Sequence, residues 1–230
     1  KIISMKKKIA ILGSTGSIGT TSLNIFKKNK NKFDIILLAA NRNYSLICKQ
    51  IKVFKPKYYI ISDELVFKKV KKKFQNEKTK IYNNFSDLNF KKKKFDITIS
   101  SIVGIAGLSP TIKFVKYTKK ILLANKETII CGWHLIKNLS KSHKTEIIPV
   151  DSEHFSIDQL TRNYKDTDIE KIYLTASGGP FLNKPLKSFN SIKASDAIKH
   201  PKWKMGKKIS IDSSNLMNKV LELIEAYRLF

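Results

Sequence analysis

The sequence predicts an α/β fold in two parts: a parallel sheet covered by helices over residues 1–150, and a smaller domain over residues 151–230. Short apolar runs alternate with stretches whose apolar residues recur at helical spacing, which is typical of a parallel sheet buried on both faces. A glycine cluster directly follows the first apolar run. After Val150 the alternation stops, and polar clusters and a Ser/Lys-rich stretch over residues 183–208 replace it. We therefore place the domain boundary at Val150.

The expected strands are continuous apolar runs, as found in strands that are covered on both faces. They fall at residues 8–12, 33–40, 95–103, 120–124 and 146–150. Strands joined by helical crossovers run parallel, so we expect one parallel sheet from this half of the chain.

Two of the connecting stretches have helical periodicity. Residues 20–28 place apolar side chains among polar ones and predict a helix after the glycine cluster. Val66, Val70 and Phe74 recur every four residues and predict a helix over residues 63–78, with its lysines pointing outward.

The composition excludes several classes of protein. Of the 230 residues 42% are hydrophobic, so global disorder is excluded. No apolar run approaches the roughly 20 residues of a membrane-spanning helix. The first residues pass directly into a strand, and we expect no secretory signal peptide. Cys48 and Cys131 indicate no disulfide framework, so we expect a reducing compartment, the cytoplasm.

The net charge of +27, from 45 Lys+Arg and 18 Asp+Glu, invites a nucleic-acid partner because lysines bind phosphate backbones. Nucleic-acid sites usually recruit arginine, whereas only Arg42, Arg162 and Arg228 are arginines here. The lysines are spread along the whole chain without interleaved aromatic residues. We favour a coding bias and expect no nucleic-acid partner, and a lysine-rich nucleic-acid surface stays the alternative.

The glycine cluster Gly13-Ser-Thr-Gly-Ser-Ile-Gly19 lies between the first expected strand and the first expected helix. Glycines at this place allow a tight turn and let backbone N–H groups approach a pyrophosphate at the helix N-terminus. The spacing G-x-x-G-x-x-G differs from the dinucleotide fingerprint G-x-G-x-x-G, but its context is the required one. Arg42 follows the next strand, and a base there suits the 2′-phosphate of NADP. The alternative is a structural turn with a surface arginine.

Two carboxylates, Asp151 and Glu153, follow the last expected strand. They would project from the same side if strand geometry persists, as ligands for Mg²⁺ or Mn²⁺. The alternative is a solvated pair at a helix N-terminus. A further acidic pair, Glu222 and Glu225, lies one turn apart on a probable helix.

Serines, amides and lysines of the second half are the donors that a phosphate monoester needs. They include Ser177 and the segment 212–214. Trp203, flanked by Pro and Gly, predicts an aromatic lid that excludes water. Taken one by one, these residues also fit structural roles: a turn cap for Ser177, a core position for Trp203, and a structural histidine at His200.

Six strings follow one another along the chain: Gly13-Ser-Thr-Gly-Ser-Ile-Gly19, Leu123-Ala-Asn-Lys-Glu127, Pro149-Val-Asp-Ser-Glu-His154, Thr175-Ala-Ser-Gly-Gly-Pro-Phe181, His200-Pro-Lys-Trp-Lys-Met-Gly206 and Asn218-Lys-Val-Leu-Glu222. Over residues 6–230 the chain thereby resembles the 1-deoxy-D-xylulose 5-phosphate reductoisomerase family, the NADPH-dependent enzymes of the non-mevalonate isoprenoid pathway. The resemblance implies a Rossmann-like NADP-binding domain over residues 1–150. It also implies the N-terminal part of an α+β catalytic domain over residues 151–230. We expect this domain to be C-terminally truncated, because family members continue further. The resemblance further implies a homodimer once the chain is completed.

The resemblance assigns a role to each matching position. NADPH-binding positions are Thr15, Gly16, Ser17, Ile18, Arg42, Asn43, Asn125, Glu127 and Gly206. Ligands of the Mg²⁺ or Mn²⁺ ion are Asp151, Glu153 and Glu222. Positions that bind the phosphosugar are Lys126, Ser152, Ser177, His200, Ser213, Asn218 and Lys219. Catalytic roles fall to Lys126, Glu153 and His200, and the lid to Trp203 and Met205.

The activity implied is the rearrangement of 1-deoxy-D-xylulose 5-phosphate and its reduction to 2-C-methyl-D-erythritol 4-phosphate. The alternatives are another NADP-dependent reductase or a catalytically impaired remnant that binds nucleic acid. Two positions depart from the family pattern: Asn41 and Val220 both stand where glycine is usual. We expect the first to alter the cofactor loop and the second to crowd the helix that carries Glu222.

Overall fold

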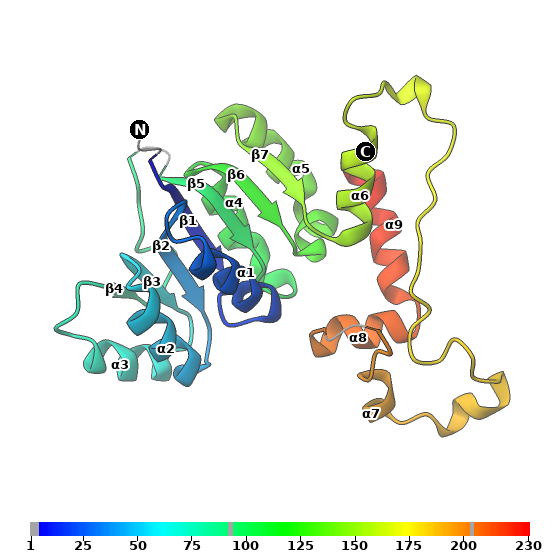
Figure 1. Ribbon diagram of the computed structural model, residues 1–230, viewed down its shortest axis with the longest axis horizontal. Helices are drawn as coiled ribbons and strands as arrows, with labels where there is room; N and C mark the ends of the chain where they lie inside the picture. The colour runs from blue at the N-terminus through cyan, green and yellow to red at the C-terminus, as the bar shows by residue number, and fades with distance from the viewer. Residues whose placement is uncertain (1–4, 92–93, 203–204) are drawn as a thin grey trace. The chain divides into compact units, whose positions relative to one another are not determined.

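The computed structural model describes residues 5–91, 94–202 and 205–230. They divide into two compact units, one ending at Val150 and the other beginning at Asp151. Figure 1 shows the elements of both units along the chain.

The first unit is built on a seven-stranded sheet in the order β4-β3-β2-β1-β5-β6-β7, in which all neighbouring strands are parallel. The strands are β1 (Lys7–Leu12), β2 (Phe33–Ala40), β3 (Tyr58–Ile61), β4 (Lys80–Tyr82), β5 (Phe95–Ser100), β6 (Thr118–Leu123) and β7 (Glu146–Pro149). The predicted parallel sheet is confirmed, and each predicted strand is present. The strand expected over residues 95–103 ends earlier, at Ser100. The sequence analysis did not predict β3 or β4, which are only four and three residues long.

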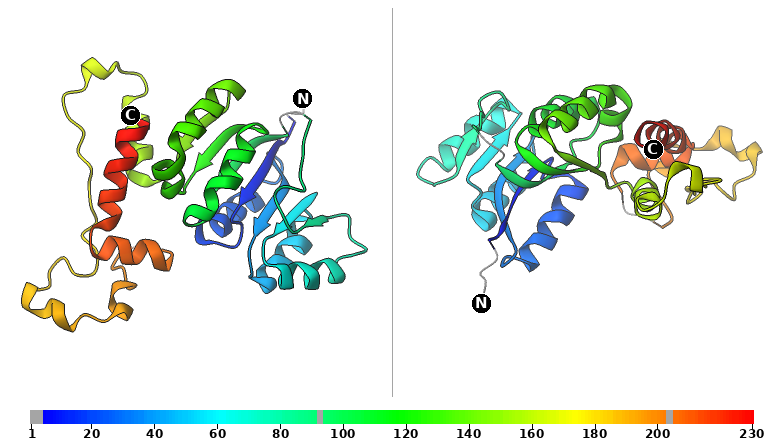
Figure 2. Two further views of the ribbon diagram at one scale, coloured as in Figure 1. Left: turned by 180° about the vertical axis from the view of Figure 1, so that it is seen from behind. Right: turned by 90° about the horizontal axis from the view of Figure 1, so that it is seen from above.

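Helices cover both faces of this sheet (Figure 2). They are α1 (Ser17–Lys28), α2 (Tyr44–Phe54), α3 (Glu64–Lys73), the 3₁₀ helix η1 (Ile105–Gly107), α4 (Leu108–Val115) and α5 (Lys126–His143). Side chains of α1, α2 and α3 share one apolar core with Ile9 and Ile11 of β1. Side chains of α4 share the other core with Ala10 and Leu12. Because successive residues of β1 enter opposite cores, its sequence is a continuous apolar run.

Helix α3 is shorter than the range of residues 63–78 that its periodicity predicts. The Asp63 side chain caps its start by accepting a hydrogen bond from the Val66 N–H at 2.9 Å. The helix ends at Lys73, and Phe74 is its C-terminal cap and stays buried. The apolar period therefore continues one residue past the helix, because Phe74 still packs into the core.

The carboxyl ends of the parallel strands lie at one edge of the sheet, and the segments that follow them meet there. The glycine loop follows β1 and Arg42 follows β2, while residues 101–104 follow β5. The chain leaves β1 toward β2 on one side, and β5 flanks β1 on the other. Such a reversal of strand order is where open α/β sheets bind their ligands.

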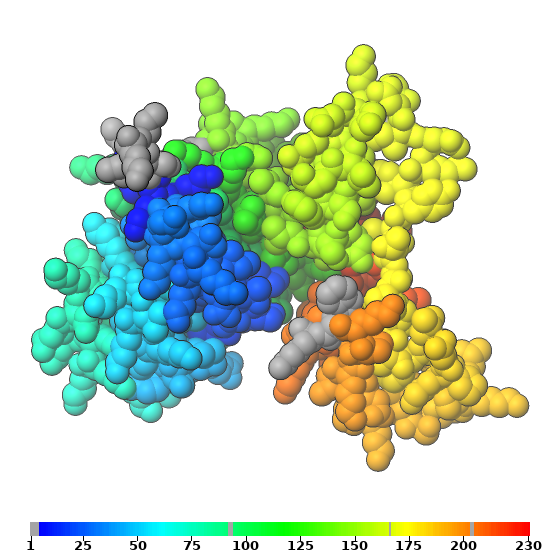
Figure 3. Space-filling view, viewed as in Figure 1, coloured from blue at the N-terminus to red at the C-terminus, as the bar shows by residue number. Residues whose placement is uncertain are grey.

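The second unit consists of helices joined by a long extended segment, and no strand is assigned among its described residues. Its elements are α6 (Ser152–Thr161), the 3₁₀ helices η2 (Asp166–Asp168) and η3 (Leu186–Ser191), α7 (Ala194–Ala197), α8 (Lys207–Ser214) and α9 (Met217–Leu229). Helix α9 packs against α6 and α8. In the space-filling view (Figure 3), the extended segment before residue 180 is a narrow yellow strip of atoms within this unit.

Helix α9 turns one apolar face to water. Val220, Leu223 and Tyr227 follow one another at spacings of three and four residues, and each is more than half exposed. Because Val220 lies on this face and α9 runs unbroken past it, the crowding expected from the valine is not found.

In the part of the chain that the structure describes, no helix combines the length and apolarity needed to cross a membrane.

We predict that Gly19→Ala destabilises the first unit, because a Cβ there would lie 2.3 Å from the Gly13 carbonyl oxygen. The expected loss in the free energy of unfolding is about 1–3 kcal/mol, measured by urea denaturation. Gly16→Ala is the matched control: its Cβ would lie 3.4 Å from the same oxygen. Its loss should stay within about 1 kcal/mol, which reflects only the weaker N-cap. Equal losses in the two variants would contradict the steric argument.

Candidate functional site

The glycine loop presents backbone N–H groups at the start of α1. Gly16 is the N-cap and has no side chain to cap the first turn, and no acidic residue lies in that turn. Gly13 has a φ of 93°, and a Cβ there would lie 2.7 Å from the Ser101 carbonyl oxygen. Glycine is therefore required where the loop passes the end of β5. Thr15, Gly16, Ser17 and Ile18, the predicted pyrophosphate residues, form the outward part of this loop and are exposed or half-buried.

Arg42 and Asn43 lie between β2 and α2. The Asn43 side chain accepts a hydrogen bond from the Leu46 N–H at 3.1 Å and so caps α2. Arg42 is exposed at the same edge of the sheet as the glycine loop. Asn41 does not adopt a positive φ, so asparagine in place of glycine introduces no left-handed strain here.

Asn125 is almost completely buried, and its side chain supports the neighbouring backbone. The carboxamide oxygen accepts a hydrogen bond from the Thr128 N–H at 2.7 Å and caps α5. The carboxamide nitrogen donates to the carbonyl oxygens of Ile102 and of Gly104, the latter at 2.8 Å. Asn125 therefore connects the segments that follow β5 and β6. The next residue, Lys126, begins α5 and is also buried, whereas Glu127 is half-buried.

The predicted metal ligands come together in the second unit. One side-chain oxygen from each of Asp151, Glu153 and Glu222 lies within 4.8 Å of the others. Strand geometry does not persist at the first two, because β7 ends at Pro149, Asp151 is the N-cap of α6, and Glu153 lies in its first turn. The pair therefore lies at a helix N-terminus, the place that the alternative named. The third carboxylate comes from α9, and Glu222 follows Asp151 by 71 positions and Glu153 by 69.

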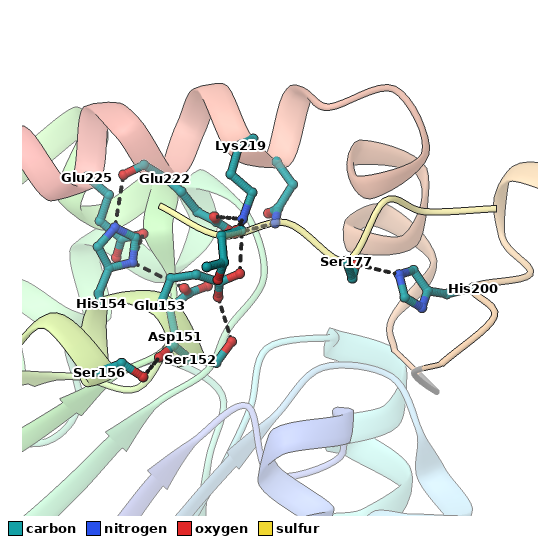
Figure 4. A network of polar contacts seen from close by, with 12 residues as sticks. Asp151, Ser152, Glu153, His154, Ser156, Ser177, His200, Lys219, Glu222 and Glu225 are labelled. Atoms are coloured by element: carbon teal, nitrogen blue, oxygen red, sulfur yellow. Dashed lines mark hydrogen bonds and ion pairs between the residues drawn. The ribbon is translucent and has the colours of Figure 1, made fainter. Parts of the chain in front are cut away.

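Lys219 lies between two of these carboxylates (Figure 4). Its Nζ is 3.0 Å from Glu153 Oε1 and 2.5 Å from Glu222 Oε2, and it also donates to the Thr175 carbonyl oxygen. Burial lowers the pKa of the Lys219 ammonium, but the bonds to Glu222 and Glu153 outweigh it and leave that pKa above its usual value. Asn218 donates a hydrogen bond to Glu222, whose side chain is 1% exposed. The buried carboxylate is thus satisfied by one cation and one amide.

A buried histidine fixes the geometry behind the cluster. His154 is completely buried, and its Nε2 lies 2.9 Å from the Glu222 backbone carbonyl oxygen. Its Nδ1 lies 3.1 Å from Asp151 Oδ1 and 3.4 Å from Glu225 Oε2. Since a carbonyl and carboxylates only accept, both ring nitrogens serve as donors when the imidazole is protonated. Burial opposes this charge, but the bond to Asp151 and the Glu225 carboxylate together raise the pKa of His154.

His154 and Glu225 are not among the predicted site residues, although His154 lies in one of the six strings and Glu225 in the second acidic pair. The available signal was the spacing: His154 lies three residues after Asp151, and Glu225 three residues after Glu222, so each pair occupies one helical face. Glu225 is 1% exposed, and charged residues are almost never so buried without a partner.

A cavity of about 1250 Å³ lies within the second unit beside the carboxylates. Among the predicted site residues, its lining includes Asp151, Ser152, Glu153, Ser177, Ser213, Asn218 and Glu222. Met205 of the predicted lid also lines it, whereas Trp203 lies outside the described residues. These seven predicted positions therefore face one space, while Lys219 and His200 contact two of the residues that line it, Glu153 and Ser177.

Two glycines bring Ser177 to this cavity. Gly178 and Gly179 have φ values of 86° and 65°, and a Cβ on Gly179 would lie 2.7 Å from the Ser213 carbonyl oxygen. The extended segment can therefore approach α8 this closely only if position 179 is a glycine. The Ser177 hydroxyl lies 2.9 Å from His200 Nε2. Gly206 is the N-cap of α8, and among the described residues, its chain neighbours aside, no heavy atom lies within 4 Å of where its Cβ would be.

Two regions of the chain match known protein families. Residues 9–132 match the family described as 1-deoxy-D-xylulose 5-phosphate reductoisomerase, and residues 147–230 match the family described as its C-terminal domain. The reductoisomerase of Pelagibacter ubique is 52% identical over 227 residues, and that of Wolbachia pipientis from Culex pipiens is 45% identical over 226. Both alignments cover 97% of this chain.

Solved structures of such enzymes have the same fold. A DOX-P reductoisomerase in complex with NADPH, fosmidomycin and magnesium superposes with a TM-score of 0.88 at 36% identity, over 97% of this chain and 58% of that one. The enzyme of Zymomonas mobilis in complex with NADPH gives 0.83 at 32% identity, over 98% and 58%. The chain spans about 58% of the length of the curated relatives that it matches first.

We predict that Lys219→Met destabilises the metal-free protein, because the nearly buried Glu222 carboxylate loses the cation at 2.5 Å. The expected loss is roughly 3 kcal/mol in the presence of EDTA. Addition of Mn²⁺ should restore more stability to this variant than to the wild type, because the divalent cation replaces the missing ammonium. Thermal unfolding with EDTA and with Mn²⁺ measures both effects.

Lys187→Met is the matched control for this prediction, since Lys187 is an exposed lysine of the same unit. It should unfold like the wild type under both conditions. If Lys219→Met left the stability in EDTA unchanged, the lysine would not be the counter-ion of Glu222.

Proposed function

Because the chain belongs to the 1-deoxy-D-xylulose 5-phosphate reductoisomerase family, we propose that it carries the cofactor and metal sites for the family's reaction. This reaction is the NADPH- and divalent-metal-dependent conversion of 1-deoxy-D-xylulose 5-phosphate to 2-C-methyl-D-erythritol 4-phosphate. The observation that carries the proposal is the convergence of Asp151, Glu153 and Glu222, which come from two separate helices, on one point.

The donor set fits a hard divalent cation. All three groups are carboxylates, and oxygen ligands of this kind suit Mg²⁺ or Mn²⁺. The buried Glu222 and the Lys219 ammonium beside it indicate a place where positive charge is required. A divalent cation held there would supply Lewis-acid polarisation of the substrate's carbonyl and hydroxyl oxygens. His154 would hold the Asp151 carboxylate in position from behind.

The first unit fits NADPH. The N–H groups at the start of α1 suit the pyrophosphate, and Arg42 suits the 2′-phosphate. NADPH would supply the hydride for reduction. We propose that Thr15, Gly16, Ser17, Ile18, Asn43, Glu127 and Gly206 contact this cofactor as well. Asn125 would act mainly by holding the segment after β5, because its carboxamide is engaged there.

The remaining predicted residues fit the phosphosugar. Ser177, Ser213 and Asn218 line the cavity with hydroxyl and amide donors, as does Ser152. His200 holds the Ser177 hydroxyl at 2.9 Å and so orients it. When a divalent cation binds the carboxylates that Lys219 now contacts, the Lys219 ammonium would pair with the negative charge of the substrate instead. We propose Lys126, Glu153 and His200 as the catalytic groups.

We further propose that the chain works in the cytoplasm as part of a homodimer, with a phosphosugar and not a nucleic acid as its partner. The spread of its lysines over the whole sequence supports the last point.

The proposal is tested by Mn²⁺ binding and by NADPH oxidation with 1-deoxy-D-xylulose 5-phosphate as substrate. Glu153→Gln should weaken Mn²⁺ binding by at least about tenfold and lower turnover by about a hundredfold, because it removes a ligand. Glu77→Gln is the matched control, since Glu77 is exposed in the first unit, away from the carboxylates. Unchanged Mn²⁺ binding by Glu153→Gln would refute the metal site.

We predict that Arg42→Ala changes the cofactor preference. A hydrogen-bonded contact with the 2′-phosphate accounts for about a 10- to 100-fold gain in affinity, so NADPH binding should weaken by that factor. NADH lacks this phosphate, and its binding should change less than about twofold. Fluorescence titration of both nucleotides measures the difference, and Arg228→Ala on α9 serves as the control. A parallel loss for NADH and NADPH would contradict the assignment.

A further inference from the structure

Three polar side chains lie buried beneath the glycine loop: Ser14 of the loop itself, Gln50 of α2 and Tyr59 of β3. Ser14 and Tyr59 are completely buried, and Gln50 is 4% exposed. Tyr59 belongs to the apolar core that includes Ile47, Ile51 and Ile61, and Gln50 is buried on the helix that carries the first two. Neither the motifs nor the proposed function gives Gln50 or Tyr59 a role.

Their hydrogen bonds orient the Gln50 carboxamide without ambiguity. Gln50 Nε2 lies 2.9 Å from the Ser14 backbone carbonyl oxygen, which can only accept, so the atom facing it is the nitrogen. Gln50 Oε1 then accepts from the Tyr59 hydroxyl at 2.6 Å and from the Ser14 hydroxyl at 2.8 Å. The two hydroxyls lie 3.1 Å apart. Burial raises the pKa of Tyr59, so its hydroxyl remains a donor.

These bonds fix Ser14 at every polar atom. Its N–H donates to the Ala39 carbonyl oxygen at 2.8 Å, its side chain bonds Gln50, and its carbonyl oxygen accepts from Gln50. The peptide bond from Ser14 to Thr15 is trans and planar, so the Thr15 N–H points opposite to the Ser14 carbonyl. Since Gln50 holds that carbonyl toward the core, the Thr15 N–H faces outward from the loop.

We propose that Gln50 and Tyr59 are positioning residues for the cofactor loop: Gln50 holds the Ser14–Thr15 peptide so that its N–H faces the pyrophosphate, and Tyr59 holds Gln50. The inference rests on the proposed binding of NADPH at this loop. A peptide unit is soft only in its two flanking dihedrals, and without the anchor it can rotate and turn a carbonyl oxygen toward the phosphates. A pre-set N–H avoids the ordering cost that binding would otherwise carry.

The burial of this triad supports a role beyond packing. Buried polar side chains rarely stabilise a core more than apolar ones of similar shape would, and the neighbours of the triad are apolar. Apolar residues could join α2 to β3, but the buried Ser14 carbonyl oxygen needs a donor, and Gln50 supplies it. Because this donor approaches from the core, it also fixes the direction of that carbonyl.

The test compares two nucleotides on the 230-residue chain: NADPH, and adenosine 2′-monophosphate, which has the 2′-phosphate but no pyrophosphate. Gln50→Leu should raise the Kd for NADPH about tenfold, and Tyr59→Phe, which keeps the ring, about threefold. Neither should change the Kd for adenosine 2′-monophosphate more than about twofold, because Arg42 is untouched. Gln75→Leu is the matched control, since Gln75 is exposed in the same unit. Circular dichroism confirms that each variant is folded, and Tyr59→Phe decides the test if Gln50→Leu does not fold.

Three results would overturn the inference. NADPH binding that stays within twofold of the wild type in the folded variants would show that the triad does not act on the loop. Equal weakening of both nucleotides would assign the triad to general stability. A wild-type chain that bound neither nucleotide would refute the proposed cofactor function, and this inference with it.

Discussion

The second unit has to offset the mutual repulsion of three carboxylates. Oxygens of Asp151, Glu153 and Glu222 lie within 4.8 Å of one another, and Glu222 has almost no contact with water. Two unit charges at about 4 Å repel by roughly 4 kcal/mol at an effective dielectric constant of about 20. The fold must therefore hold positive charge among them, and Lys219 does so in the arrangement seen here. His154, which is buried behind the cluster, lies in the same way between two carboxylates, those of Asp151 and Glu225.

The first unit meets the opposite requirement by a different means. The cofactor proposed for it is an anion, yet the proposed site uses few charged side chains. Backbone N–H groups at the start of α1 face outward, and glycines at Gly13 and Gly19 let the loop lie close against its surroundings. Backbone groups of this kind need accurate orientation, which buried side chains such as Gln50 and Asn125 provide. The site of the second unit depends on charged side chains, and the proposed site of the first depends on the orientation of backbone N–H groups.

Much of this could be predicted from the sequence, and the reasons for the rest are physical. Strands β1, β2, β5, β6 and β7 can be predicted because burial on both faces makes them continuous apolar runs. Strands β3 and β4 are too short for a period to stand out. The spacing of Asp151 and Glu153 pointed to a carboxylate pair but left both a strand end and a helix start open, because the two look alike over three residues. The contact of Gln50 with Ser14 joins residues far apart in the chain, and one sequence carries no signal for it.

The exposed face of α9 has a consequence for handling the protein. Val220, Leu223 and Tyr227 repeat at the spacing that forms the seam of a coiled coil, and here these side chains are exposed to solvent. Salts excluded from protein surfaces, such as sulfate, strengthen apolar association, whereas they also screen the repulsion among molecules of net charge +27. Both effects act in the same direction, so the colloidal stability of the chain should fall steeply as sulfate is added and be greatest in dilute, weakly hydrated salts.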